Sequence, residues 1–390
     1  MNTDEKTNYP NLLKSTFQQK FNQEPLIFSS PGRVNLIGEH TDYNMGFVLP
    51  AAINKNIFLA IQKIESKEIQ LISYDYQESY STTLDSIKPS GKLWPDYILG
   101  VVDQMQKKGA HFTGFNIIFG GNIPEGAGLS SSAALECASA FAFNHLFDLG
   151  FSKIELAKLS QSAENEFVGV KCGIMDQFAS VFGKEENLIR LDCESLEFTY
   201  IPFRASNIKL VLFDTRVKHS LATSAYNKRR EECEKAVSLI NAHHPEISSL
   251  RYATEEMLLK FVKPFDEIAY QRSTYVVAEI KRLIDGCVDL ENDEIEKFGK
   301  RMFETHLGLK NLYGVSCDEL DHLVDLVKGN PNVLGARMMG GGFGGCTINL
   351  IKTEAIESTI KEVSEGYKKL TGKDVETYIA EIGKGTCLLT

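Results

Sequence analysis

A glycine-rich stretch between a predicted strand and a predicted helix constrains this chain most. An apolar run at residues 115–119 indicates a buried strand, and Gly120, Gly121, Pro124, Gly126 and Gly128 then forbid regular structure. A helical pattern begins at residue 130 and continues to residue 149. Glycines let the backbone approach oxygen atoms closely, and a helix N-terminus offers free N–H groups and a partial positive charge. The stretch at residues 120–136 therefore predicts a phosphate-binding loop.

Two familiar phosphate loops do not fit this stretch. A Walker A loop requires a lysine after its last glycine, and no lysine follows Gly126 or Gly128. A dinucleotide fingerprint requires a third glycine where Ser131 stands. A tight turn capped by serines is the structural alternative, which the loop by itself leaves open.

Length and charge narrow the class of protein. A chain of 390 residues with 43% hydrophobic residues favours two domains. The sequence pattern changes near Ser206, which predicts one domain at residues 1–206 and another at residues 207–390. The formal net charge of −10 disfavours nonspecific binding to nucleic acid or to an anionic membrane surface. Any phosphate binding must therefore be local, and we expect neither nucleic acid nor membrane as a partner.

The N-terminus and the cysteines indicate a cytoplasmic protein. The first ten residues are polar, and no apolar run approaches the ~20 residues that a membrane span needs. The eight cysteines are scattered, without a Cys-x-x-Cys pair or zinc spacing. Reduced thiols in the cytoplasm explain this usage.

Ionisable residues are concentrated in the segment at residues 29–50. Arg33, Glu39, His40 and Asp42 lie on backbone interrupted by proline and glycines, which argues against one smooth strand. A solvated hairpin tip is the alternative to a polar binding site.

Three later positions allow both a functional and a structural interpretation. Trp94 and Tyr97 share a face of the helical pattern at 94–107, which suits core packing or an adenine edge. Glu164 lies on a helix that begins at a capping box, residues 152–155. Asp176 falls in the first turn of a helix at 174–182, where an ordinary capping aspartate would also occur.

The second half predicts an α+β unit. A strand at 208–213 precedes a charged helix at about 220–242, which contains Tyr226. A strand, glycine turn and strand follow at 334–350, then a helix at 354–370 and a strand at 375–382. We therefore expect an α+β fold with two packed layers.

Separated stretches together resemble one family. Residues 31–43 resemble the galactokinase signature, and residues 172–178 are similar to galactokinases around their catalytic aspartate. Residues 124–134 resemble the phosphate loop of the GHMP small-molecule kinases, and residues 340–345 resemble that superfamily's third motif. The resemblance spans about residues 29–350. It implies a two-domain GHMP kinase fold, with an N-terminal mixed sheet, a ferredoxin-like C-terminal domain and an active site in the cleft between them.

The resemblance also implies an activity and a set of residue roles. The expected reaction is ATP-dependent phosphorylation of D-galactose at the anomeric hydroxyl, with Asp176 as base and Arg33 as stabiliser of developing charge. Mg²⁺, which prefers oxygen ligands, would be held by Ser132 and Glu164. The sugar would contact Glu39, His40, Thr41, Asp42, Gly173 and Tyr226. The nucleotide would contact Gly126, Ala127, Gly128, Leu129, Ser130, Ser131, Ser132, Ser73, Trp94 and Tyr97.

Two alternatives share these motifs. An N-acetylgalactosamine kinase would differ mainly in room beside the sugar 2-position. A non-catalytic galactose and ATP sensor would have a shortened serine-alanine segment, whereas residues 130–134 are full length here. We expect a monomer whose partners are small molecules.

Overall fold

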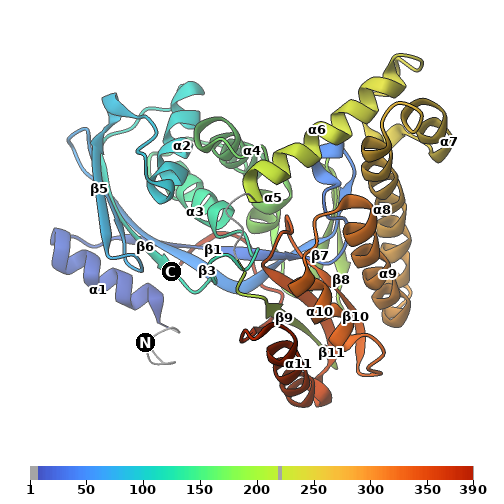
Figure 1. Cartoon of the computed structure of the whole chain (residues 1–390). Helices are drawn as coiled ribbons and strands as arrows, with labels where there is room; N and C mark the ends of the chain where they lie inside the picture. The colour runs from blue at the N-terminus through green and yellow to red at the C-terminus, as the bar shows by residue number, and fades with distance from the viewer. Residues whose placement is uncertain (1–7, 218–221, 390) are drawn as a thin grey trace.

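The computed structural model describes residues 8–217 and 222–389, and over these residues the strands form three sheets (Figure 1). The largest sheet has six strands, and only its β4–β6 pair is parallel. In spatial order its strands are β13 (Cys387–Leu389), β1 (Leu26–Asn35), β3 (Pro50–Lys63), β6 (Phe115–Gly121), β4 (Glu68–Ser73) and β5 (Glu78–Thr83).

Helices cover both faces of this sheet (Figure 1). Alternation along the strands sends Ile27, Ala60 and Ile118 towards one face, where they pack against one helix. That helix is α1 (Tyr9–Phe21). The neighbouring strand residues face the larger core on the other side. There lie α2 (Leu93–Lys107), α3 (Ser131–Leu146), α4 (Lys153–Ser162) with its π-helical continuation (Ala163–Val168), and α5 (Met175–Phe182).

A four-stranded antiparallel sheet organises the second half of the chain. Its order is β10 (Val333–Met338), β11 (Cys346–Lys352), β9 (Ile208–Asp214) and β12 (Glu376–Ala380). Helices α10 (Asp318–Val327) and α11 (Ile356–Thr371) pack on it around a separate apolar cluster. The order strand, helices, strand, strand, helix, strand is the one that a ferredoxin-like unit requires.

The remaining elements connect these two sheets. A small sheet contains β2 (Phe47–Val48), β7 (Asn187–Asp192) and β8 (Phe198–Pro202). A helical group consists of α6 (Ala222–Asn241), α7 (Glu255–Met257), α8 (Glu267–Glu291), α9 (Ile295–Gly308) and a π-helical segment (Leu309–Tyr313), with its own buried cluster. Within the described residues, no helix is both long and apolar enough to cross a bilayer.

Most predicted elements are present, with shifted ends. The capping box at Ser152 and Glu155 is confirmed, and α11 and β12 agree with their predicted ranges to within two residues. The predicted start of α6 at Ser220 lies outside the described residues.

The expectation that residues 29–50 do not form one smooth strand is confirmed, although regular strand backbone extends as far as Asn35. Strand β1 continues through Pro31 and Gly32, with a register shift between Pro31 and Arg33. A bulge can hold a proline, which has no N–H to donate, without ending the strand. Irregular backbone then begins at Leu36.

The chain returns to its first sheet at the end. Strand β13 pairs with β1, Ile27 opposite Leu389 and Ser29 opposite Cys387. The boundary near Ser206 stays a prediction, but residues 387–389 complete the first sheet although they were assigned to the second domain.

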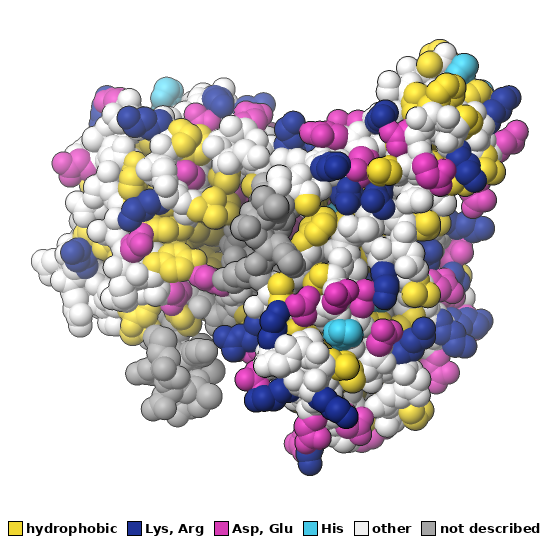
Figure 2. Space-filling model, viewed as in Figure 1, with side chains coloured by type: hydrophobic (Ala, Val, Ile, Leu, Met, Phe, Trp, Pro, Cys, Tyr) yellow, Lys and Arg dark blue, Asp and Glu magenta, His cyan; other side chains and the backbone are white. Residues whose placement is uncertain are grey.

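Acidic and basic side chains are interspersed over the face of the molecule in Figure 2.

Candidate active site

The glycine loop joins β6 to α3 and uses backbone conformations that favour glycine. Gly126 and Gly128 have φ angles of 73° and 72°, and Ser130 also has a positive φ of 59°. Ala127 and Leu129 are buried in the core. The first intrahelical bond runs from Ala134 N–H to the Ser130 carbonyl. The N–H groups of residues 131–133 precede it and form the helix N-terminus that phosphate binding requires.

The interpretation of this loop as a serine-capped turn is wrong. Ser130 is the N-cap of α3, but its side chain makes no cap hydrogen bond. Instead, Ser130 Oγ donates to Asp176 Oδ2. A non-glycine residue held at positive φ is characteristic of functional sites, because surrounding contacts must compensate for the strain.

Asp176 is paired with Arg33 rather than used as a helix cap. Arg33 Nε donates to Asp176 Oδ1 at 2.8 Å, and Nη2 donates to Oδ2 at 2.9 Å. Arg33 Nη1 donates to the carbonyl of Gly128. The N-cap of α5 is Ile174, and no side chain of residues 8–217 or 222–389 caps this helix, so the capping interpretation of Asp176 is wrong. Burial alone would lower the pKa of Arg33, but the charges of Asp176 and Glu39 raise it.

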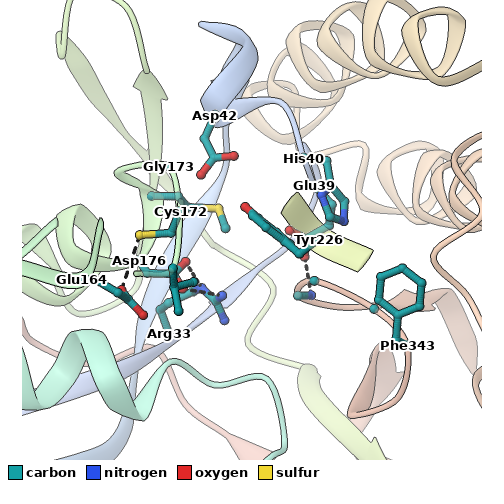
Figure 3. Close-up of a pocket in the computed structure, with 15 residues that line it drawn as sticks. Arg33, Glu39, His40, Asp42, Glu164, Cys172, Gly173, Asp176, Tyr226 and Phe343 are labelled. Carbon is teal, nitrogen blue, oxygen red and sulfur yellow. Dashed lines mark hydrogen bonds and ion pairs between the residues drawn. The ribbon is translucent and has the colours of Figure 1, made fainter. Parts of the chain in front are cut away.

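A cavity of about 230 Å³ brings most of the predicted sugar residues together (Figure 3). Figure 3 shows the Arg33–Asp176 pair on one side of it and His40 with Tyr226 on the other. The lining residues are Arg33, Glu39, His40, Asp42, Glu164, Val170, Cys172, Gly173, Met175, Asp176, Tyr226, Gly340, Gly341, Gly342 and Phe343.

Glu39 is held by the second half of the chain. Its Oε1 accepts from the Gly340 N–H at 2.7 Å and from Arg337 Nη2 at 3.1 Å. Burial would raise the pKa of Glu39, but Arg337 and Arg33 lower it, so this carboxyl stays ionised. Because Oε1 is occupied, Oε2 is the oxygen left to accept from a ligand hydroxyl.

Gly173 and Asp42 are in close contact across the cavity. A Cβ on Gly173 would lie 1.9 Å from Asp42 Oδ2, so any side chain here would displace that carboxyl. Burial, and next the charge of Asp176, raise the pKa of Asp42 to about 7. Asp42 is only 8% exposed, which explains the size of the effect.

We expect Asp42→Asn to stabilise the ligand-free protein progressively as pH rises. A carboxyl whose pKa rises from 3.8 to about 7 on folding supports the fold while protonated, and this contribution is lost between those values. Relative to the parent, the variant should gain about 1–4 kcal/mol in free energy of unfolding between pH 4 and pH 8. Urea unfolding at both pH values measures the gap, and a gap independent of pH would contradict the assignment.

Thr41 does not line the cavity, unlike its predicted neighbours. Its Oγ1 donates to the Gly38 carbonyl at 2.8 Å and lies within hydrogen-bonding distance of the Phe47 carbonyl. It is fully buried and stabilises the loop that carries Glu39, His40 and Asp42. The predicted sugar contact of Thr41 is therefore replaced by a structural role.

Ser132 and Glu164, the predicted metal ligands, are in contact. Ser132 Oγ donates to Glu164 Oε1 at 3.1 Å, and Gln177 Nε2 donates to Glu164 Oε2 at 2.7 Å. Burial, and next the charge of Asp176, raise the pKa of Glu164 to about 7. In residues 8–217 and 222–389, no three His, Cys, Asp or Glu side chains form a metal cluster. Two hard oxygen donors beside a phosphate loop nevertheless fit Mg²⁺, which usually completes its shell with phosphate and water.

Five of the ten predicted nucleotide residues line a second cavity beside the phosphate loop. Ser73, Trp94, Tyr97, Ser131 and Ser132 all contribute to it. Trp94 Nε1 donates to Glu78 at 3.1 Å, which fixes the orientation of the indole. Ser73 is fully buried, and its Oγ accepts from the Tyr76 N–H at 3.3 Å. An aromatic wall next to free helix N–H groups is the arrangement that a nucleotide base and its phosphates require.

Several site residues were missed by sequence reasoning. Arg337 is completely buried and holds Glu39, and Gln177 bridges Glu164 and Glu136. An arginine within an otherwise apolar strand was a signal for the first, because a buried charge needs a partner. Cys172 and Phe343 lie inside motifs that were recognised, but nothing in the pattern marked their side chains.

Comparison with known proteins is consistent with this geometry. The chain matches the galactokinase galactose-binding signature over residues 15–63, and the N-terminal and C-terminal domains of GHMP kinases over 96–184 and 288–369. The fold also resembles a mevalonate kinase from Methanococcus jannaschii at TM-score 0.66 and 22% identity, over 93% of this chain and 99% of that chain. The fold and the site together define a GHMP kinase.

Relatives of higher sequence identity show to which family of GHMP kinases the chain belongs. A galactokinase from Thermotoga petrophila is 41% identical over 91% of this chain and 98% of its own length. One from Fusobacterium nucleatum is 40% identical over 96% and 98%. The crystal structure of Lactococcus lactis galactokinase complexed with galactose superposes at TM-score 0.94 and 34% identity, over 97% of this chain and all of that one. This chain belongs to the galactokinase family.

Proposed function

We propose that this chain transfers the γ-phosphoryl group of ATP to the anomeric hydroxyl of D-galactose, giving galactose 1-phosphate. The observation that carries the proposal is the position of the Arg33–Asp176 pair. The pair adjoins the phosphate loop through Ser130 and Gly128, and it also lines the polar cavity of Glu39, His40 and Asp42. A sugar hydroxyl in that cavity and a phosphate on the loop would meet at this pair.

Asp176 is the proposed acceptor of the hydroxyl proton. Oδ2 accepts from both Arg33 and Ser130, which fixes the carboxylate plane, whereas Oδ1 accepts only from Arg33 and keeps a second lone pair for the proton. Arg33 is buried and charged, so it would stabilise both the forming alkoxide and the charge on the transferred group. Asp176 thus accepts the proton while Arg33 compensates the charge.

The loop and the helix N-terminus bind and align the phosphates. Phosphoryl transfer depends mainly on alignment and charge neutralisation, which the N–H groups of residues 131–133 can supply. Ser132 and Glu164 would hold Mg²⁺, which when bound neutralises phosphate charge.

The two alternative functions predict different results in an activity assay. A sensor would bind galactose and ATP without turnover, although the full-length loop and the intact Arg33–Asp176 pair favour an enzyme. An N-acetylgalactosamine kinase would prefer the substituted sugar. A coupled ADP-release assay with galactose and N-acetylgalactosamine tests all three. We expect higher kcat/KM with galactose, and the reverse preference or no turnover would overturn the proposal.

We expect Ser132→Ala and Glu164→Gln to weaken Mg²⁺-dependent turnover by about 10-fold or more while galactose affinity stays within about 3-fold of the parent. Both side chains are proposed to act through the metal, and glutamine still accepts from Gln177. Turnover against Mg²⁺ concentration and calorimetry with galactose alone separate the two effects.

Ser139→Ala is the matched control for these variants. Ser139 lies on the same helix and donates only to the Leu135 carbonyl within it. It should leave the Mg²⁺ dependence unchanged. Galactose affinity that falls as far as turnover in Ser132→Ala would assign that residue to the fold or the sugar cavity instead.

A further inference from the structure

A buried hydrogen-bond chain leads away from the sugar cavity at His40. His40 Nδ1 lies 2.7 Å from the Tyr43 hydroxyl, which lies 2.8 Å from the Tyr313 hydroxyl. Cys233 Sγ lies 3.3 Å from the same Tyr313 oxygen. His40 and Tyr43 lie on the loop between β1 and β2. Tyr313 ends the π-helical segment after α9, and Cys233 lies on α6. Of these four hydrogen-bonded groups, only His40 has been assigned above to substrate binding or catalysis.

The other imidazole nitrogen has no partner. His40 is 4% exposed, and its Nε2 is buried without a hydrogen bond among the described residues. The Gly341 backbone lies near the ring and favours a proton on it, but forms no hydrogen bond with Nε2. A buried nitrogen without a partner carries a desolvation cost, which a ligand atom in the cavity can remove.

Protonation states limit how the chain can be polarised. Burial lowers the pKa of His40 to about 4, against the opposing charge of Glu39, so the ring is neutral at pH 7 and carries a single N–H. Burial also raises the pKa of Tyr43 and Tyr313, so both keep their hydroxyl protons. The hydrogen bonds between these neutral groups can therefore run from donor to acceptor in either of two directions.

The chemistry of its far end favours one direction. If the thiol donates to Tyr313, then Tyr313 donates to Tyr43 and Tyr43 donates to His40 Nδ1, so that every acceptor is nitrogen or oxygen. The opposite direction ends with a hydroxyl donating to sulfur, which is a weak acceptor. The first direction leaves the imidazole proton on Nε2, which is the nitrogen without a hydrogen-bond partner in the described part of the protein.

We propose that Tyr43 and Tyr313 are positioning residues for sugar recognition, which fix His40 as the tautomer with its proton on Nε2. His40 then donates to one hydroxyl oxygen of the bound sugar, while Glu39 Oε2 accepts from another. Ring contacts hold the imidazole in place, with centroids 5.4 Å from Tyr226 and 4.8 Å from Tyr313. The inference rests on the proposed function for the identity of the sugar, but the tautomer is a property of the free protein.

Hydroxyl removal tests the role of each tyrosine. We expect Tyr43→Phe to raise the galactose dissociation constant about 5- to 100-fold, because Nδ1 loses its donor, and Tyr313→Phe to raise it less. The kcat with saturating galactose should change by less than about 3-fold, since neither hydroxyl contacts the reacting atoms. Tyr367→Phe is the matched control, because Tyr367 is also fully buried and donates to a backbone carbonyl elsewhere.

A panel of monodeoxy galactoses adds a readout that a structural role would not move. The parent should bind one deoxy sugar especially weakly because His40 loses its acceptor there. In Tyr43→Phe, the affinity ratio between galactose and that sugar should fall towards one, while the ratios for the other deoxy sugars stay. Unchanged ratios in a folded Tyr43→Phe protein, or an effect equal to that of Tyr367→Phe, would overturn the proposal.

The tautomer can be measured without any substrate. In a ¹⁵N-histidine-labelled full chain, with His40 assigned by its absence in His40→Gln, long-range ¹H–¹⁵N spectra distinguish protonated from unprotonated ring nitrogens. We expect a neutral ring with its proton on Nε2 at pH 7, and a mixture of tautomers in Tyr313→Phe. A proton on Nδ1 in the parent would contradict the inference. A parent that shows the expected tautomer but does not bind galactose would instead refute the proposed function.

Discussion

Asp176→Asn should lower turnover with ATP and galactose by about 10²–10⁴-fold. Asparagine keeps the shape and one acceptor oxygen but cannot take the proton from the sugar hydroxyl. It also replaces one of the two Arg33 hydrogen bonds with an N–H that points at a guanidinium. We therefore expect a loss of stability of about 1–3 kcal/mol, since the Arg33 side chain is only 5% exposed. Single-turnover kinetics and urea unfolding separate the two effects.

The Asp192–Arg251 pair provides a matched control for this variant. Arg251 also donates to both carboxylate oxygens, but its side chain is 19% exposed, against 5% for Arg33. Asp192→Asn should therefore cost somewhat less stability, while turnover stays within about 3-fold of the parent. An active Asp176→Asn enzyme would remove the base from the mechanism and leave Arg33 and alignment to carry the reaction.

Galactose should be phosphorylated up to ~10⁴-fold more efficiently than glucose, measured as kcat/KM. The two sugars differ only in the configuration of one hydroxyl, and the groups that line the cavity are buried. His40 Nε2 is buried without a partner among the described residues and lies beside Glu39 and Asp42 in the cavity lining, so a misplaced hydroxyl would leave this nitrogen unpaired.

Glu39→Gln tests the source of this selectivity. Glutamine keeps the size of the side chain but replaces one carboxylate oxygen with an amide, which disturbs the contacts with Arg337 and Gly340. The galactose to glucose ratio should fall together with galactose affinity. Comparable kcat/KM for both sugars in the parent enzyme would refute the assignment of the substrate.

The parts of the site that could be predicted are those with a local signal. Glycines at positive φ, the capping box at Ser152 and the first turn that contains Asp176 are each specified by a few adjacent residues. The family resemblance then assigned roles to residues whose local patterns allowed two interpretations. Asp176 shows the limit of the local argument, because a capping aspartate and a paired aspartate occupy the same position in a helix.

The remaining parts depend on contacts between residues far apart in the sequence. Arg337 reaches back about three hundred residues to Glu39, and Tyr313 reaches Tyr43 over a similar separation. Pairing of β13 with β1 is equally distant, and three residues give too short a pattern to predict it. Thr41 was misassigned because its motif places it among ligand-binding residues, whereas its hydroxyl turns into the loop.

The most direct test of the central claim is identification of the product. Incubation of the enzyme with ATP, Mg²⁺ and ¹³C-labelled galactose, followed by ³¹P and ¹³C spectra, locates the transferred phosphoryl group. The account predicts one product, with phosphorus coupled to C1 and one ADP formed per sugar consumed. A phosphate on C6 or any other carbon, or ADP formed without a sugar phosphate, would contradict it.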